Sequence, residues 1–133
     1  MTQDQPRDGA AGQHRVLIVD DDALVGEAVQ RVLRTSYRVT FAQSATGAIG
    51  RLQGGARFDA IVCDLMMPGL SGFQLHAEIL KIAPEQARRI VFLTGYAGSH
   101  DVEEFVRSTG VRVLPKPFTR QELRDVVEEL VRG

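Results

Sequence analysis

Short apolar runs alternate with longer amphipathic stretches along almost the whole chain. The short runs are rich in β-branched residues and are apolar throughout, instead of alternating with polar positions. This pattern predicts strands of a parallel sheet that is covered on both faces. We expect strands at residues 16–20, 37–41, 58–64, 89–94 and 111–114.

The stretches between and after these runs carry apolar residues three and four positions apart. Each therefore predicts a helix with one buried face and one charged face. The first buried stripe begins at Leu24 and ends at Leu33, and the last extends from Leu123 to Val131. Polar residues precede each stripe at the spacing of helix caps. They are Asp22, Ser44 and Ser99 as N-caps, and Ser71 with Gln74 and Thr119 with Glu122 as capping boxes.

Five strand–helix units in succession predict an α/β fold. Right-handed crossovers between parallel strands place helices on both faces of the sheet, which gives a doubly wound architecture. We assign residues 15–132 to this domain, and residues 1–14 to a flexible polar tail because they lack periodicity. In such a sheet, ligands bind at the carboxyl ends of the strands. The candidate chemistry should therefore lie in the loops that follow the strands.

Composition narrows the class of protein without naming a function. The 133 residues carry 16 basic and 17 acidic side chains, so no overall charge favours binding to nucleic acid or to an anionic membrane. No apolar run approaches the length of a membrane helix. The single cysteine, Cys63, has no partner for an internal disulfide and is expected to be a buried apolar residue. These features favour a reducing compartment, and we expect a cytoplasmic protein.

Polar residues collect at the predicted carboxyl ends. Asp20 and Asp21 end the first strand, and Asp64 ends the third. Thr94 ends the fourth strand, and Lys116 follows the fifth. Two carboxylates about 4 Å apart repel by about 4 kcal/mol at an effective dielectric constant near 20, so this group calls for a cation. All-oxygen ligands favour a hard cation, and we expect Mg²⁺.

Lys116 and Thr94 add the groups that a phosphoryl group needs for its remaining oxygens. An aspartate can act as a nucleophile toward phosphorus and become an aspartyl-phosphate. Asp64 is the candidate because it is the lone acid at the end of a central strand, and the turn 66–69 leaves its approach open. The residues thus predict a site where one carboxylate is phosphorylated.

These motifs, in this order, resemble the receiver domain of bacterial two-component response regulators. The resemblance covers about residues 15–132 and rests on Asp20-Asp21, Asp64 with Met67-Pro68-Gly69, Thr94-Gly95 and Lys116-Pro117-Phe118. It implies a flavodoxin-like (βα)5 fold with strand order 2-1-3-4-5. It also implies a phosphorylation-dependent switch that is not an enzyme in the ordinary sense, although it catalyses its own phosphorylation and slow dephosphorylation.

The resemblance assigns a role to each residue of the group. Asp21, Asp64 and the Met66 carbonyl would bind Mg²⁺ directly, and Asp20 would act mainly through water. Lys116 would pair with Asp64 or its phosphate through a loop with a cis Lys116–Pro117 bond, and Thr94 would bind the phosphoryl group and move inward.

The resemblance also implies partners. The phosphodonor would be a sensor histidine kinase or a histidine phosphotransfer protein. The output would be an unidentified downstream protein that binds the face formed by the fourth helix, fifth strand and fifth helix. A weak homodimer is compatible with this scheme, whereas direct contact with nucleic acid or membrane is not expected. Because the chain ends soon after the fifth helix, it is either a stand-alone receiver or a part of a larger regulator or hybrid kinase.

The chain departs from the family pattern at the switch. Val113 stands where an aromatic residue is common, so the output is expected to involve the loop after the fourth strand, where Tyr96 is the nearest aromatic residue. Met66 and Tyr96 occupy the positions two after Asp64 and Thr94. Neither carries an acid or amide that could orient a hydrolytic water, which predicts slow self-dephosphorylation.

Two other functions remain open from the residues. An aspartate-nucleophile phosphohydrolase also forms an aspartyl-phosphate, but it generally carries a second acid where this chain has Met66. A degenerate receiver could serve only as a protein-binding module, although the intact acids, Thr94 and Lys116 argue against it. The three histidines, at positions 14, 76 and 100, lack the spacing of metal ligands and are expected on the surface.

Overall fold

A computed structural model of the chain describes residues 13–133. Most of the tail expected at residues 1–14 therefore lies outside the described residues. The sheet has five parallel strands in the order β2-β1-β3-β4-β5, which confirms the expected fold. The strands are β1 (Arg15–Val19), β2 (Arg38–Ala42), β3 (Ala60–Asp64), β4 (Ile90–Thr94) and β5 (Arg112–Pro115). The helices are α1 (Ala23–Leu33), α2 (Ala45–Gln53), α3 (Gly72–Ile82), α4 (His100–Thr109) and α5 (Arg120–Arg132).

Local signals in the sequence set where the helices begin. The side chains of Asp22, Ser44 and Ser99 accept hydrogen bonds from the first turns of α1, α2 and α4. Both predicted capping boxes, at the starts of α3 and α5, are formed. Each cap satisfies backbone N–H groups that have no partner within the helix.

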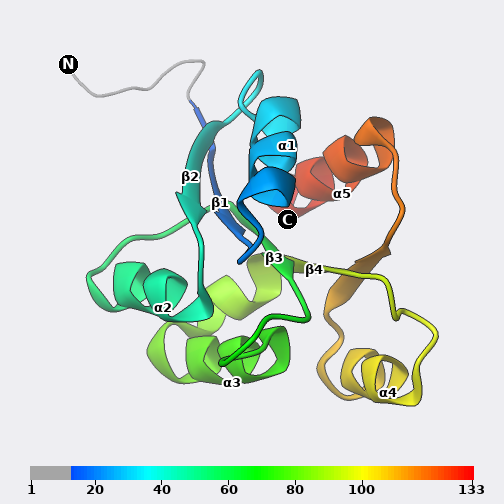
Figure 1. Cartoon of the computed structure of the whole chain (residues 1–133). Helices are drawn as coiled ribbons and strands as arrows, with labels where there is room; N and C mark the ends of the chain where they lie inside the picture. The colour runs from blue at the N-terminus through cyan, green and yellow to red at the C-terminus, as the bar shows by residue number, and fades with distance from the viewer. Residues whose placement is uncertain (1–12) are drawn as a thin grey trace.

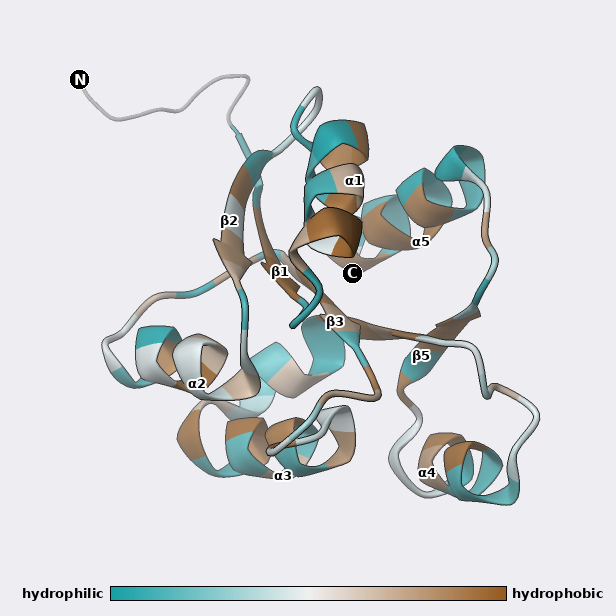
Figure 2. Cartoon of the chain, viewed as in Figure 1, coloured by the Kyte–Doolittle hydropathy of each residue, from teal (hydrophilic) through white to brown (hydrophobic). Residues whose placement is uncertain are grey.

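Two helical layers enclose the sheet. Helices α1 and α5 cover one face, and α2, α3 and α4 cover the other (Figure 1). Figure 2 shows that the strands are largely apolar, whereas the helices alternate between apolar and polar residues as they turn. In β3 and β4 every residue is buried, as expected for central parallel strands. Within residues 13–133, none of the helices combines the length and apolarity that crossing a lipid bilayer requires.

Three features differ from the sequence-based expectation. His76 is buried on α3 with 5% of its surface exposed, so its expected place on the surface was wrong. Leu24, assigned to the buried stripe, is 83% exposed. A 3-10 helix, η1 (Pro84–Arg89), follows α3. Within it, the Gln86 side chain bonds both the N–H and the carbonyl of Phe58, which replaces strand pairing at that point of the chain.

Candidate functional site

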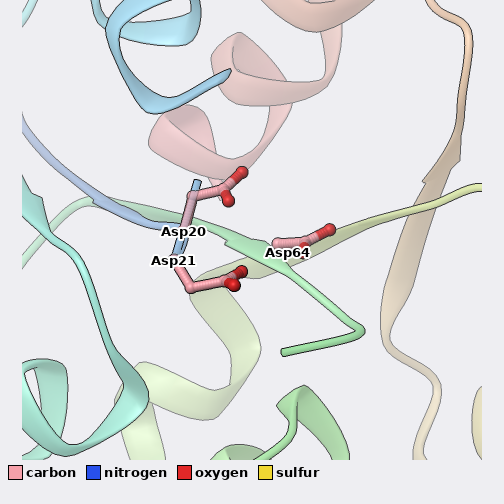
Figure 3. A group of neighbouring side chains, drawn as sticks. All are labelled: Asp20, Asp21 and Asp64. Carbon is pink, nitrogen blue, oxygen red and sulfur yellow. The ribbon is translucent and has the colours of Figure 1, made fainter. Parts of the chain in front are cut away.

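Three carboxylates meet at the carboxyl edge of the sheet. Asp20 and Asp21 follow β1, and Asp64 ends the neighbouring strand β3. One oxygen from each lies within 4.8 Å of the others (Figure 3). Asp20 and Asp64 are buried, with 3% and 8% exposed, whereas Asp21 is exposed. The register of adjacent parallel strands therefore brings together the acids that the sequence predicted.

Asp20 is the acid with the most perturbed environment. Its Oδ1 accepts a hydrogen bond of 2.8 Å from the N–H of Asp22, which favours the charged form. Burial opposes this effect and is the largest influence, and the charges of Asp64 and Asp21 add to it. Together they raise the pKa of Asp20 to about 6. The charge of Lys116 and the Asp22 N–H lower the pKa, but they do not outweigh burial, so the ionised Asp20 carboxylate is destabilised at neutral pH.

Replacing Asp20 with Asn should stabilise the metal-free protein at pH 7. The folded carboxyl holds its proton more tightly than the unfolded one, so its ionisation lowers the free energy of unfolding as the pH rises from about 4 to about 6. Asn retains the oxygen that bonds Asp22 and removes the charge. We expect a gain of about 1–3 kcal/mol in urea unfolding. The gain should shrink at about pH 4, where Asp20 is protonated, and a gain equal at both pH values would contradict this electrostatic cause.

Lys116 supplies the positive charge of the group. Its Nζ donates a hydrogen bond of 2.9 Å to Oδ1 of Asp64, and the two side chains are 35% and 10% exposed. The N–H of Lys116 also bonds the carbonyl of Thr94 at 2.8 Å, which fixes the β5–α5 loop against the end of β4. The Lys116–Pro117 peptide bond is cis, as the resemblance implies. The ammonium group is thus held at the nucleophile candidate by both backbone and side chain.

Thr94 is buried at the end of β4, with 1% of its surface exposed. Its Oγ1 accepts a hydrogen bond of 2.9 Å from the N–H of Tyr96. This bond, which the sequence analysis did not foresee, leaves the hydroxyl proton available to another acceptor. It also ties Thr94 to the β4–α4 loop, where the Tyr96 side chain is 64% exposed.

The remaining residues singled out from the sequence surround this group. Met66 is 49% exposed in the loop after Asp64. Val113 is half-buried on β5 and packs against the apolar core beneath β4. Cys63 is fully buried, and burial raises the pKa of its thiol well above the ordinary value, so it is an inert apolar residue as expected.

The donor set fits a hard divalent cation. The three carboxylates offer only oxygen ligands, and their spacing lets one ion approach all of them. Among residues 13–133, this is the group of three or more acidic, histidine or cysteine side chains whose ligand atoms lie close enough together to bind one ion. The three carboxylates outnumber the single ammonium of Lys116, so a cation would favour the ionised form of Asp20, which burial and, to a smaller extent, the charges of Asp64 and Asp21 disfavour. Asp20, Asp21 and Asp64 are therefore suited to hold Mg²⁺.

A second surface feature escaped the sequence analysis. An apolar groove of about 640 Å³ lies between α1 and α5, beside the exposed Leu24. Its lining includes the apolar residues Val25 and Phe118 and the charged residues Arg31 and Arg124. The apolar spacing of α1 predicted that this whole face of the helix is buried. Spacing alone does not show how far a neighbouring helix covers that face.

Comparison with known proteins places this fold and site in one family. The model of the response regulator receiver domain matches residues 16–128. The receiver protein CpdR of Brucella abortus is 30% identical over 87% of this chain and 92% of its own. The hydrogenase transcriptional regulatory protein HoxA of Bradyrhizobium diazoefficiens is 32% identical over 90% of this chain, which spans only 24% of that regulator.

Solved structures agree with this placement. The receiver domain of a sensor histidine kinase from Pseudomonas aeruginosa has a TM-score of 0.80 and 27% identity, covering 92% of this chain and all of that one. That structure holds a magnesium ion coordinated in its active-site cleft. The chain belongs to the response regulator receiver domain family, whose members are signalling domains of two-component systems.

Proposed function

We propose that the chain is a phosphorylation-dependent switch in which Asp64 accepts a phosphoryl group from a phosphohistidine. The observation that carries this proposal is the 2.9 Å contact between Lys116 Nζ and Asp64 Oδ1 beside two further carboxylates. Asp64 stands at an edge of the sheet that a donor can reach, since Met66 and Asp21 beside it are exposed. The receiver unit would comprise residues 15–132, and Asp64, Lys116 and Thr94 would be its reacting group.

The transfer can be written with these residues. A carboxylate oxygen of Asp64 attacks phosphorus, the bond between phosphorus and the donor imidazole breaks, and the imidazole leaves with the electron pair and takes up a proton. Lys116 donates a hydrogen bond to the transferred group and offsets its charge. The hydroxyl of Thr94 accepts a hydrogen bond from the N–H of Tyr96, and its own proton would be donated to a second phosphoryl oxygen.

A divalent cation belongs to this scheme. Asp21, Asp64 and the Met66 carbonyl would bind Mg²⁺ directly, and Asp20 would act mainly through water. When bound, the ion neutralises the charge that gathers on the phosphoryl oxygens during transfer. Burial and neighbouring carboxylates disfavour the charged form of Asp20, so positive charge at the site would be bound favourably.

Phosphorylation is proposed to alter the face formed by α4, β5 and α5, where a downstream protein would bind. Thr94 is bonded to the β4–α4 loop, so an inward movement of its hydroxyl would pull on the backbone of Tyr96. Val113 has no ring that could follow such a movement. Tyr96, the exposed aromatic residue of the β4–α4 loop, would respond in its place. The donor would be a histidine kinase or phosphotransfer protein, and a downstream protein would read the altered face.

The proposal is tested with the protein, Mg²⁺ and acetyl phosphate, followed by intact mass. We expect a gain of one phosphoryl group that requires Mg²⁺ and is removed by hydroxylamine, as an acyl phosphate is. Rapid consumption of acetyl phosphate over many turnovers would instead support the phosphohydrolase. A failure to gain mass with this donor and with a phosphorylated histidine kinase would support a protein-binding module and overturn the proposal.

The phosphorylated form should be long-lived. Met66 and Tyr96 flank the approach of water and are exposed, yet neither side chain carries an acid or amide that could orient an attacking water. We expect loss of the phosphoryl group over minutes or longer after the donor is removed, measured by intact mass. Met66→Asn should shorten this lifetime, and a wild-type lifetime of seconds would refute the expectation.

A further inference from the structure

Helix α4 is attached to the domain by few side chains. Val102 is its one buried residue, Phe105 and Val106 are half-buried, and every other residue of the helix is exposed. By comparison, α3 buries Gly72, Leu75, His76 and Ile79. A helix with so little buried apolar surface lies at the low end of local stability in a fold. Its position therefore depends strongly on the contacts of Phe105.

Phe105 packs into a cluster of aromatic rings from three elements. Its ring centroid lies 4.8 Å from that of Phe73, 5.4 Å from that of His76 and 5.5 Å from that of Phe92. All three pairs are edge-to-face, with interplanar angles of 65–88°. Pairs of this kind stabilise a contact by about 0.5–1.5 kcal/mol beyond the area they bury. The aromatic cluster of Phe73, His76, Phe92 and Phe105 thus joins α3, β4 and α4.

His76 is the titratable member of this aromatic cluster. It is buried against the rings of Phe92 and Phe105, which offer no carbonyl or carboxylate acceptor to its nitrogens. Such an imidazole is stable when neutral, whereas the charged form loses its hydration without gaining an acceptor. Burial accordingly lowers the pKa of His76 below the usual 6.5, and no neighbouring charge contributes to this shift.

The charged groups near the aromatic cluster lie outside it. On α3, Glu78 pairs with Lys81. Helix α4 contributes His100, Asp101 and Glu104 to the lining of a cavity of about 340 Å³ beside Phe73 and Phe105, and Glu104 also pairs with Arg107. Strand β4 has no charged residue. If Phe105 separates from His76, a charged imidazole gains access to water.

We propose that His76 makes the contact between α3 and α4 sensitive to pH. Protonation of His76 would release Phe105 and loosen α4 from the sheet. Protonation of His76 favours a state in which water reaches the imidazolium. Helix α4 is the element expected to move, because Val102 is its one buried residue. The sign follows from the pKa. Well above the ordinary pKa of 6.5, His76 is neutral whether or not α4 is docked, and its titration does not affect docking. Docking weakens as the pH falls through 6.5 toward the lower pKa of the docked state.

The test is amide hydrogen exchange of the unphosphorylated, metal-free protein, so that its outcome does not depend on phosphotransfer. Exchange is compared at about pH 7.5 and about pH 5, on either side of the ordinary histidine pKa, after correction for the intrinsic pH dependence. We expect exchange in residues 100–109 to rise several-fold at the lower pH, while exchange in α3 changes little. His76→Phe keeps an aromatic ring without a proton site and should abolish the rise.

The control is His100→Gln, which removes the exposed histidine of α4 itself and should leave the rise intact. If His76→Phe does not fold, NMR titration of the wild type decides the matter. The resonances of α4 must then shift with the midpoint of His76 and not with that of His100. Exchange in α4 that is independent of pH, or a His76 midpoint at or above 6.5, would overturn the proposal.

Discussion

Asp64→Asn is expected to abolish the phosphoryl gain. The amide keeps the size of the side chain and one oxygen, but its nitrogen cannot attack phosphorus as a carboxylate oxygen does. Asp64 is also the acid that contacts Lys116, at 2.9 Å, so no other carboxylate of the group is placed to share that ammonium in the same way. Intact mass after incubation with Mg²⁺ and acetyl phosphate should show unmodified protein.

Asp22→Asn provides the matched control. Asp22 is the residue after the acidic pair, and its carboxylate caps α1 by accepting from Leu24 and Val25. Asn is an equally good N-cap, so the variant should fold and gain the phosphoryl group as the wild type does. Phosphorylation of Asp64→Asn at the wild-type rate would move the nucleophile to Asp20 or Asp21 and refute the assignment.

Asp64→Asn should change the free energy of unfolding only slightly. Removing the charge of Asp64 relieves its repulsion with Asp20, which should return toward its ordinary pKa. The same change leaves Lys116 without its ionic partner. Because these effects oppose each other, the variant can be compared with the wild type at similar stability, and a lost phosphoryl gain reports on chemistry.

The fold followed closely from the pattern of apolar residues. Continuous apolar strands and periodic helices each satisfy a strong local requirement, and caps such as Ser71 and Thr119 mark where helices begin. The site followed as well, since parallel strands must present their carboxyl ends at one edge. Asp20 follows β1 and Asp64 ends β3, and these strands are neighbours in the sheet. The resemblance implied that strand order, whereas the order of the strands along the chain does not.

Other features were not accessible in this way. The burial of His76 depends on where Phe92 and Phe105 lie, which is a tertiary property with no local signal. The hydrogen bond from the Tyr96 N–H to Thr94 depends on the path of a loop. Leu24 has the correct spacing for burial, yet it lies at the exposed start of α1. In each case the sequence supplies the side chain, and distant parts of the chain decide its surroundings.

The loop that carries the site also depends on one close contact at the start of α3. Gly72 lies against Leu65, the residue after Asp64, and its N–H donates a 2.8 Å hydrogen bond to the Leu65 carbonyl. A Cβ at position 72 would lie 2.9 Å from the Leu65 Cα and 3.0 Å from its carbonyl oxygen. Real Cβ atoms essentially never approach backbone so closely, so the loop or the helix would have to move.

Gly72→Ala should therefore lower the free energy of unfolding by about 1–3 kcal/mol, the usual cost of forcing an extra methyl group into a packed site. Gly50→Ala is the matched control, because Gly50 lies exposed within α2 and a Cβ there meets no atom within 4 Å. That change should stabilise the protein by about 0.5–1 kcal/mol, since alanine favours a helix. Urea unfolding measures both variants. Because the strain falls beside Asp64, Gly72→Ala should also slow phosphorylation, whereas Gly50→Ala should not. Equal free energies of unfolding for the two variants would contradict this prediction and show that Leu65 moves aside without cost.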